Sequence, residues 1–206
     1  MIEIRDLTKR YGGRVVLSIR ELSLKPGRYV LRGPNGSGKT TLLRILAGLI
    51  KPSSGEVRVL GGDPYGEMRI KRLIAYVGHR TGLVEDLNGR ENATLLLCGL
   101  LGCERLGPFM DMARRLNLEH ILGRPVRTYS KGERTKLSVA IALASGREVL
   151  LLDEPFAPLD VPSRETLGDM LGTWEGKFVI ITAHGEVPDI GGRTIELGRN
   201  PHRPYN

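Results

Sequence analysis

Gly33-Pro34-Asn35-Gly36-Ser37-Gly38-Lys39-Thr40-Thr41 is the stretch that decides the fold of this 206-residue chain. It fits the phosphate-loop pattern of a glycine, four residues, and then glycine, lysine and a hydroxyl residue. Residues 29–31 before it are typical of a short buried strand, and apolar residues recur at helical spacing through 42–49 after it. A strand, a glycine-rich loop and a helix, in that order, are the context that the motif requires.

The residue types of this loop indicate nucleotide binding. Glycines let backbone N–H groups approach phosphate oxygens, and the start of the next helix adds unpaired donors and the positive end of its dipole. We expect Lys39 to contact the β- and γ-phosphates and the Thr40 hydroxyl to bind Mg²⁺. The other expected contacts are Asn35, Gly36, Ser37, Gly38 and Thr41. A glycine-rich turn beside an ordinary helix is the alternative, and the strand–loop–helix context argues against it.

Composition is that of a soluble globular protein, with 40% hydrophobic and 26% charged residues. No apolar run is long enough to span a membrane and no secretory signal is evident, so the sequence favours a cytoplasmic chain. The net charge of +8 would suit nucleic acid or an anionic membrane surface. Because the basic residues are spread along the chain, we expect no nucleic acid and favour a membrane-proximal location.

Two cysteines, Cys98 and Cys103, are the only ones in the sequence. Their spacing matches no common zinc or redox motif. We therefore expect them to fill apolar space, and we expect no disulfide in a cytosolic chain.

Apolar patterns predict an α/β fold whose sheet is mainly parallel, with an antiparallel region near the N-terminus. Residues 2–5 alternate like an edge strand with one buried face. Continuous apolar runs at 149–152 and 178–181 are typical of parallel strands covered on both faces. Further strands are expected at 15–24, 56–60, 73–77 and 194–197.

The middle of the chain is expected to be helical. Residues 92–101 and 108–118 show helical spacing, and Ser130 stands where the N-cap of a further helix belongs. We therefore expect a helical subdomain at about 81–147, inserted into a single domain that spans 1–206. The tail at 198–206 has little apolar surface and is expected to be loose.

Asp153 and Glu154 directly follow the apolar run at 149–152. In open α/β sheets, ligands gather at the carboxyl ends of the strands. Asp153 could hold Mg²⁺ there, and Glu154 could accept a proton from an attacking water. An acidic pair that merely starts a loop is the alternative, and the phosphate loop upstream favours catalysis.

With these motifs in order, the chain resembles the ATP-binding subunits of ABC (ATP-binding cassette) transporters. Residues 129–134, Tyr-Ser-Lys-Gly-Glu-Arg, look like the ABC signature, usually written Leu-Ser-Gly-Gly-Gln. The resemblance implies a P-loop NTPase fold and ATP hydrolysis. It also implies that two cassettes, identical or different, close head to tail, so that Ser130 and Gly132 serve the ATP held by the other one. An integral membrane subunit would supply the transport path, which places the cassette on the inner face of the membrane.

Other roles follow from the same resemblance. Tyr11 takes the place of the aromatic residue that stacks on adenine, although a turn tyrosine explains it equally well from the sequence alone. Asp160 looks like part of the D-loop at the dimer seam, and His184 matches the switch histidine that contacts the γ-phosphate. Lys131 and Glu133 depart from the usual signature residues, and Glu133 brings a negative charge near a phosphate site.

The function predicted from these residues is that of an ATPase subunit that drives a membrane transporter. A soluble ABC ATPase without a channel, for example in cofactor assembly, is the alternative, and a regulatory module that barely hydrolyses ATP is a third. Gly78-His79 resembles the haem-export cassettes of cytochrome c maturation, but the sequence by itself selects neither a cargo nor a direction of transport.

His79 stands where the family usually has a glutamine that senses Mg²⁺ and the γ-phosphate. An imidazole can accept a hydrogen bond or bind the metal, and it titrates near neutrality. We therefore predict that ATP turnover depends more steeply on pH in the wild type than in a His79→Gln variant. Rates measured across the pH range test this, and superimposable profiles would contradict it.

Overall fold

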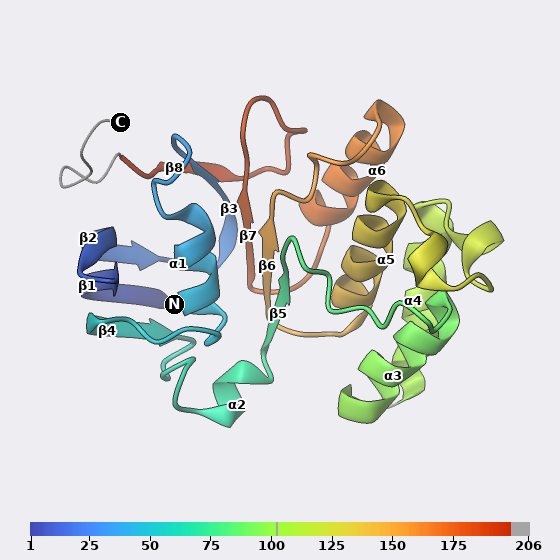
Figure 1. Cartoon of the computed structure of the whole chain (residues 1–206), viewed down its shortest axis with the longest axis horizontal. Helices are drawn as coiled ribbons and strands as arrows, with labels where there is room; N and C mark the ends of the chain where they lie inside the picture. The colour runs from blue at the N-terminus through green and yellow to red at the C-terminus, as the bar shows by residue number, and fades with distance from the viewer. Residues whose placement is uncertain (102, 199–206) are drawn as a thin grey trace.

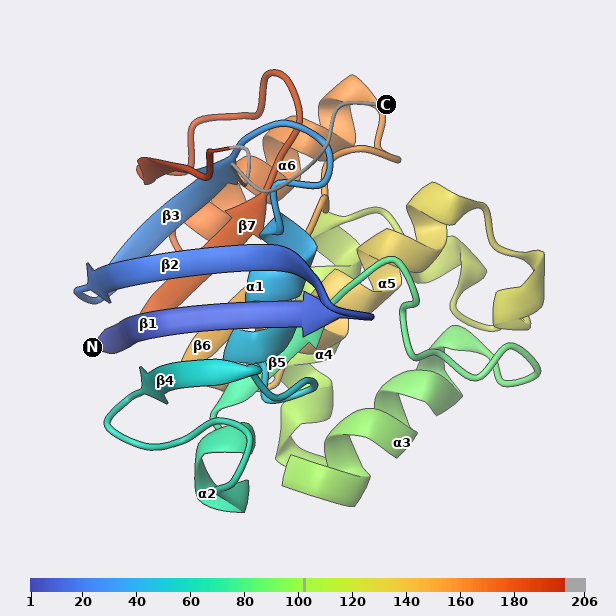
Figure 2. The ribbon, with the colours of Figure 1, turned by 60° about the vertical axis from the view of Figure 1, so that its left-hand side comes forward.

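The computed structural model describes residues 1–101 and 103–198 (Figure 1). The tail that the sequence predicts to be loose lies outside these residues, apart from Gly198. The helix that follows the phosphate loop lies between two sheets, and a layer of other helices covers the far face of the larger sheet (Figures 1 and 2). Among the described residues, every helix is too short or too polar to cross a membrane.

The larger sheet has five parallel strands in the order β5-β6-β7-β3-β8. They are β3 (Gly27–Arg32), β5 (Ile74–Val77), β6 (Val149–Asp153), β7 (Phe178–Thr182) and β8 (Arg193–Glu196). Every residue of β6 and β7 is buried, as expected for strands covered on both faces. Alternate residues of β6 enter two different cores: Val149 and Leu151 face one, while Leu150 and Leu152 face the other.

The smaller sheet has three antiparallel strands in the order β2-β1-β4. They are β1 (Ile2–Tyr11), β2 (Arg14–Leu24) and β4 (Ser54–Val59). The expectation of an edge strand at residues 2–5 is wrong, because β1 is the central strand and pairs on both sides. The alternation of apolar and polar residues in β1 shows that one face of the strand is covered. An edge strand and a central strand can both have one covered face, so the alternation does not distinguish them. Ile2, Ile4 and Leu7 are the buried residues of that face.

Helix α1 (Lys39–Leu46) lies between the two sheets (Figure 1). Its apolar residues Leu42, Leu43, Ile45 and Leu46 are almost completely buried in a core that both sheets share. The helix is therefore held on two sides, and the loop at its N-terminus is fixed at the carboxyl end of β3. The short helix α2 (Met68–Lys71) precedes β5.

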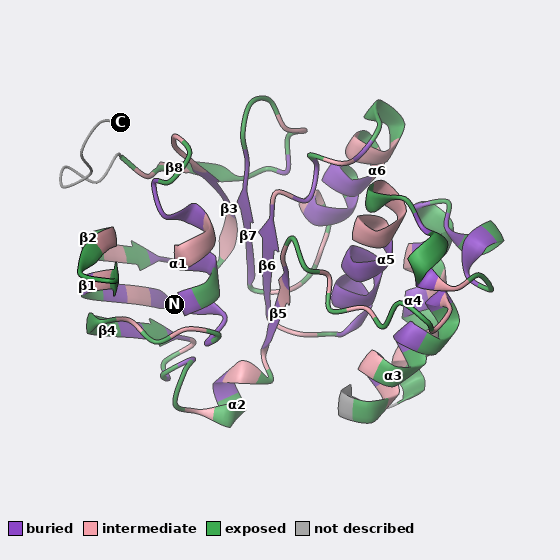
Figure 3. Ribbon diagram, viewed as in Figure 1, coloured by how far each residue is buried: buried purple, intermediate pink, exposed green. Residues whose placement is uncertain are grey.

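The other helices cover the opposite face of the parallel sheet (Figures 1 and 3). They are α3 (Gly89–Leu101), η1 (Cys103–Arg105), α4 (Leu106–Arg115), η2 (Glu119–Ile121), η3 (Val126–Thr128), α5 (Lys131–Ala144) and α6 (Val161–Gly172). Helix α5 packs on the sheet with a continuous buried stretch, Leu137–Ala144. Helices α3 and α4 begin a few residues earlier than the sequence predicts. Helix α6 was not among the elements predicted from the sequence.

Cys98 in α3 and Cys103 in η1 form a disulfide, so the expectation of two apolar thiols is wrong. The two Cα atoms lie 4.3 Å apart. Spacing in the sequence does not reveal this close approach, and a reducing compartment bears on the redox state of the thiols and not on the distance between them.

Candidate active site

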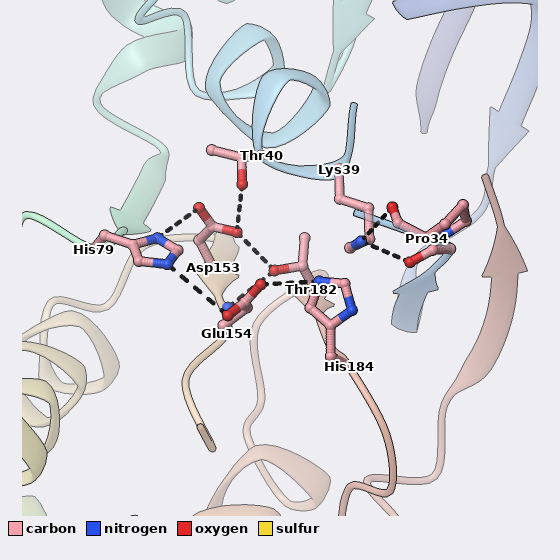
Figure 4. A network of polar contacts seen from close by, with 9 residues as sticks. Pro34, Lys39, Thr40, His79, Asp153, Glu154, Thr182 and His184 are labelled. Carbon is pink, nitrogen blue, oxygen red and sulfur yellow. Dashed lines mark hydrogen bonds and ion pairs between the residues drawn. The ribbon is translucent and has the colours of Figure 1, made fainter. Parts of the chain in front are cut away.

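The phosphate loop connects β3 to α1, as its sequence predicts. Gly38 caps the helix with a left-handed φ of 96°, where a side chain would come within 2.8 Å of Leu17 Cδ1. Lys39, the first residue of α1, is buried and folds back over the loop (Figure 4). Its ammonium group donates to the carbonyls of Gly33 at 2.8 Å and Pro34 at 3.2 Å.

Burial lowers the pKa of Lys39 below its ordinary value, because it disfavours the charged ammonium. The carboxylates of Glu154 and Asp153 act in the opposite direction. These two acidic residues therefore face the lysine closely enough to influence it electrostatically. The remaining positions expected to contact phosphates belong to the same loop and to the first turn of α1: Asn35, Gly36, Ser37, Gly38 and Thr41.

Asp153 ends β6 with a side chain that is fully covered. Its Oδ1 accepts hydrogen bonds from the Thr40 hydroxyl at 3.0 Å and from the Thr182 hydroxyl at 2.7 Å. Its buried Oδ2 has no hydrogen-bond partner among the described residues, and His79 Nδ1 lies 3.3 Å away. One carboxylate thus ties α1, β6 and β7 together (Figure 4).

The pair of Thr40 and Asp153 fits Mg²⁺. Both offer oxygen atoms, and Mg²⁺ in nucleotide sites is commonly held by one or two carboxylates together with substrate phosphates and water. An unpartnered buried oxygen, Asp153 Oδ2, is the kind of acceptor that a cation would satisfy. Within the described part of the chain, no three His, Cys, Asp or Glu side chains form a ready-made metal cage.

Glu154 turns its carboxylate into the same site. Its backbone adopts a left-handed φ of 55°, which is uncommon for a non-glycine residue and is frequent at functional sites. Its Oε1 lies 3.2 Å from His184 Nε2, and its Oε2 lies 3.9 Å from His79 Nε2 (Figure 4). Two imidazoles therefore flank a carboxylate that remains partly exposed.

Thr182 is the site residue that the sequence analysis missed. It is fully buried, donates to Asp153 and accepts from the Glu154 N–H at 2.9 Å. Strands β6 and β7 pair in parallel with Asp153 opposite Thr182, so the contact follows from the register. The signal in the sequence that could have identified Thr182 is its position, because its hydroxyl ends the continuous apolar run at 178–181.

Ser130 caps α5 in a reciprocal arrangement with Glu133. The Ser130 hydroxyl accepts from the Glu133 N–H at 3.2 Å, and the Glu133 carboxylate accepts from the Ser130 N–H at 2.6 Å. The hydrogen bond from the Ser130 backbone is the main reason that the pKa of Glu133 is lowered. The glutamate that departs from the family signature therefore stabilises the turn.

Gly132 and Asp160 also have local structural roles. A side chain at Gly132 would come within 2.8 Å of the Pro158 carbonyl, so the signature turn and the segment before α6 are in close contact. The Asp160 carboxylate caps α6 by accepting from the Ser163 N–H at 3.0 Å. Both Ser130 and Asp160 remain exposed.

The predicted site residues fall into two groups. Lys39, Thr40, Asp153, Glu154, His79 and His184 converge at the carboxyl ends of the parallel strands (Figure 4). Ser130, Gly132 and Asp160 belong to a second group, and a cleft of about 560 Å³ separates this part of the chain from His79 and Glu154. Tyr11 stands apart at the end of β1, half exposed, with the Lys9 ammonium 4.9 Å from its ring centre.

Comparison with known proteins identifies the family. The ABC transporter family model matches residues 17–157. The chain is 35% identical to the cytochrome c biogenesis ATP-binding export protein CcmA of Gluconobacter oxydans, over 98% of this chain and 90% of that protein.

Solved structures agree with this result. A dimeric structure of the bacterial ABC transporter cassette MJ0796 superposes with a TM-score of 0.86 at 27% identity, over 96% of this chain and 94% of that chain. The dimer of MJ0796 in a post-hydrolysis state, bound to ADP and Pi, gives a TM-score of 0.82 at 26% identity with the same coverage. The P-loop fold and the family resemblance predicted from the sequence are confirmed. The chain therefore belongs to the ABC transporter family, as one of its ATP-binding and ATP-hydrolysing subunits.

Proposed function

We propose that this subunit powers an exporter that serves cytochrome c biogenesis. The observation that carries its ATPase role is the convergence of Lys39, Thr40, Asp153 and Glu154 at one edge of the sheet. The export role is supported by the likeness to CcmA, which extends over nearly the full length of both chains. Transport is favoured over a soluble assembly ATPase, because the relative is named as an export protein.

Nucleotide binding is the first step that the site supports. The loop N–H groups and the Lys39 ammonium would bind the phosphates, with Lys39 exchanging the carbonyls of Gly33 and Pro34 for phosphate oxygens. Thr40 and Asp153 would hold Mg²⁺, which would supply charge neutralisation to the phosphates. Tyr11 would stack on the adenine ring.

Hydrolysis would depend on Glu154. Its carboxylate would accept a proton from the attacking water as the general base. His184, 3.2 Å from Glu154 Oε1, would orient that carboxylate and contact the γ-phosphate. His79, on the other side, would complete the metal and phosphate environment in place of the usual glutamine.

Two cassettes would close over two nucleotides. Ser130, Gly132 and Asp160 would serve the nucleotide of the other cassette, because a cleft lies between this part of the chain and its own Glu154, and because Ser130 and Asp160 are exposed. The two cassettes would be identical or different. Residues 81–147 would act as a helical subdomain of one domain, and the assembly would dock on an integral membrane subunit at the cytoplasmic face.

Replacing Glu154 with glutamine tests the dimer and the general base together. Hydrolysis should slow by about a hundredfold or more, because the amide cannot accept the proton. ATP should then hold the cassettes as a stable dimer that gel filtration resolves from the monomer. Hydrolysis at the wild-type rate would remove Glu154 from its role.

Thr182 should be needed for catalysis more than for nucleotide binding. Thr182→Val keeps the shape, but it leaves the Glu154 N–H without its acceptor and leaves Asp153 Oδ1 with the Thr40 hydroxyl as its remaining donor. We expect kcat to fall by about tenfold or more, which corresponds to about 1.4 kcal/mol in the barrier. Thr182→Ser, which keeps the hydroxyl, is the control. Equal rates for the valine and serine variants would contradict the prediction.

The export role is tested in cells that carry a deletion of the gene. Mature c-type cytochromes should be depleted, and the wild-type chain but not Lys39→Ala should restore them. A tagged wild-type chain should also bring an integral membrane subunit out of detergent-solubilised membranes. Normal cytochrome c levels in the deletion strain would refute the proposed cargo pathway while leaving the ATPase assignment intact.

A further inference from the structure

Two segments that are far apart in the sequence lie side by side at the cleft. Residues 84–88 follow the His79 loop on the way to α3, and residues 125–130 lead into α5 (Figures 1 and 2). Backbone amides of the 125–130 segment donate to carbonyls of the 84–88 segment in two hydrogen bonds, of 3.0 and 2.8 Å. The main chain therefore already joins the loop that carries His79 to the turn that carries Ser130.

Arg134, in the first turn of α5, joins the same two segments through its side chain. Its Nη1 donates to the Glu85 carboxylate at 2.7 Å. Its Nε and Nη2 donate to the carbonyls of Tyr129 at 3.2 Å and Arg127 at 3.0 Å. All three guanidinium nitrogens are thus used at once, and 30% of the Arg134 side chain and 63% of the Glu85 side chain are exposed. A lysine ammonium cannot reproduce this planar arrangement of donors.

We propose that Arg134 is a positioning residue, which through Glu85 holds the Ser130 turn in a fixed orientation to the His79 loop of its own chain. The inference rests on the proposed cassette dimer, in which Ser130 serves the partner's nucleotide. His79 contacts Asp153 and Glu154 at the chain's own nucleotide site. The Glu85–Arg134 pair therefore couples the nucleotide site of a cassette to the orientation of the Ser130 turn that faces its partner.

A second ion pair between the same segments supplies a matched control. Arg127 Nη1 lies 2.8 Å from Asp86 Oδ1, but both side chains are largely exposed, at 57% and 86%. Exposed pairs of this kind contribute little. Neither side chain binds the carbonyl that precedes Ser130, whereas Arg134 does. Removal of the Asp86 charge should therefore leave the orientation of the turn unchanged.

The test measures dimerisation separately from nucleotide binding. Glu85→Gln, Arg134→Lys and the control Asp86→Asn are each placed in the Glu154→Gln chain, where ATP holds the dimer. Sedimentation with ATP gives the dimer dissociation constant, and a fluorescent ATP analogue gives the nucleotide affinity of the monomer. Glu85→Gln and Arg134→Lys should weaken dimerisation at least about fivefold, within the range of coupling between sites, while monomer affinity stays unchanged. Asp86→Asn should leave both values unchanged.

The combined variant of Glu85→Gln and Arg134→Lys should dimerise no more weakly than Arg134→Lys alone, because Arg134→Lys already disrupts the contact that Glu85→Gln weakens. Thermal unfolding of each variant identifies a general loss of stability. If Arg134→Lys fails to fold, the dimer dissociation constant of Glu85→Gln tests the inference by itself, because this variant keeps both carbonyl contacts of the guanidinium. Dimerisation of Glu85→Gln equal to that of Asp86→Asn would overturn this inference alone. Failure of the parent Glu154→Gln chain to dimerise with ATP would overturn the proposed function as well.

Discussion

The buried carboxylate of Asp153 is the constraint on which the arrangement of the site depends. A charge without solvent contact is costly unless hydrogen bonds or opposite charges compensate it. Here the hydroxyls of Thr40 and Thr182 share one oxygen, and His79 faces the other. These partners come from α1, β7 and the loop after β5. The ends of these elements must therefore lie close to the end of β6 for the carboxylate to keep its contacts. The same oxygens that stabilise the fold are those that suit a cation.

Local signals made the centre of the site predictable. The phosphate loop, the apolar run before Asp153 and the cap at Ser130 each lie within about ten residues of sequence, where propensity and spacing are informative. Thr182 was missed because its role depends on a register between β6 and β7, whose paired residues Asp153 and Thr182 are far apart in the chain. The prediction that β1 is an edge strand was wrong for a related reason. Pairing with β4 uses backbone hydrogen bonds and so requires no particular side chains in β1. The disulfide depends on the close approach of Cys98 and Cys103, which spacing alone does not show.

The signature segment departs from the usual residue types of its motif but keeps a capped turn at the start of α5. Glu133 replaces the usual glutamine, yet its carboxylate completes the cap of α5 by accepting from the Ser130 N–H. Gly132 is retained at the position where the Pro158 carbonyl leaves no room for a side chain. Lys131, which replaces the first signature glycine, is exposed. The limited space beside the Pro158 carbonyl and the cap formed by Ser130 and Glu133 therefore account for the residues found at positions 132 and 133.

Helix α5 is buried along its C-terminal part, and its N-terminal end is held by contacts with neighbouring loops. Its last eight residues, Leu137–Ala144, are buried against the sheet, while the turns nearer its N-terminus are partly exposed and are capped by Ser130 (Figure 3). The buried stretch begins at Leu137, which lies about 10 Å along the helix axis from the cap at Ser130. A tilt of about 5° at that point would move the capped end by about 1 Å, which is enough to stretch a hydrogen bond beyond its usual length. In the proposed dimer, small rotations of the helical layer would therefore bring the serine hydroxyl into or out of reach of the partner's nucleotide.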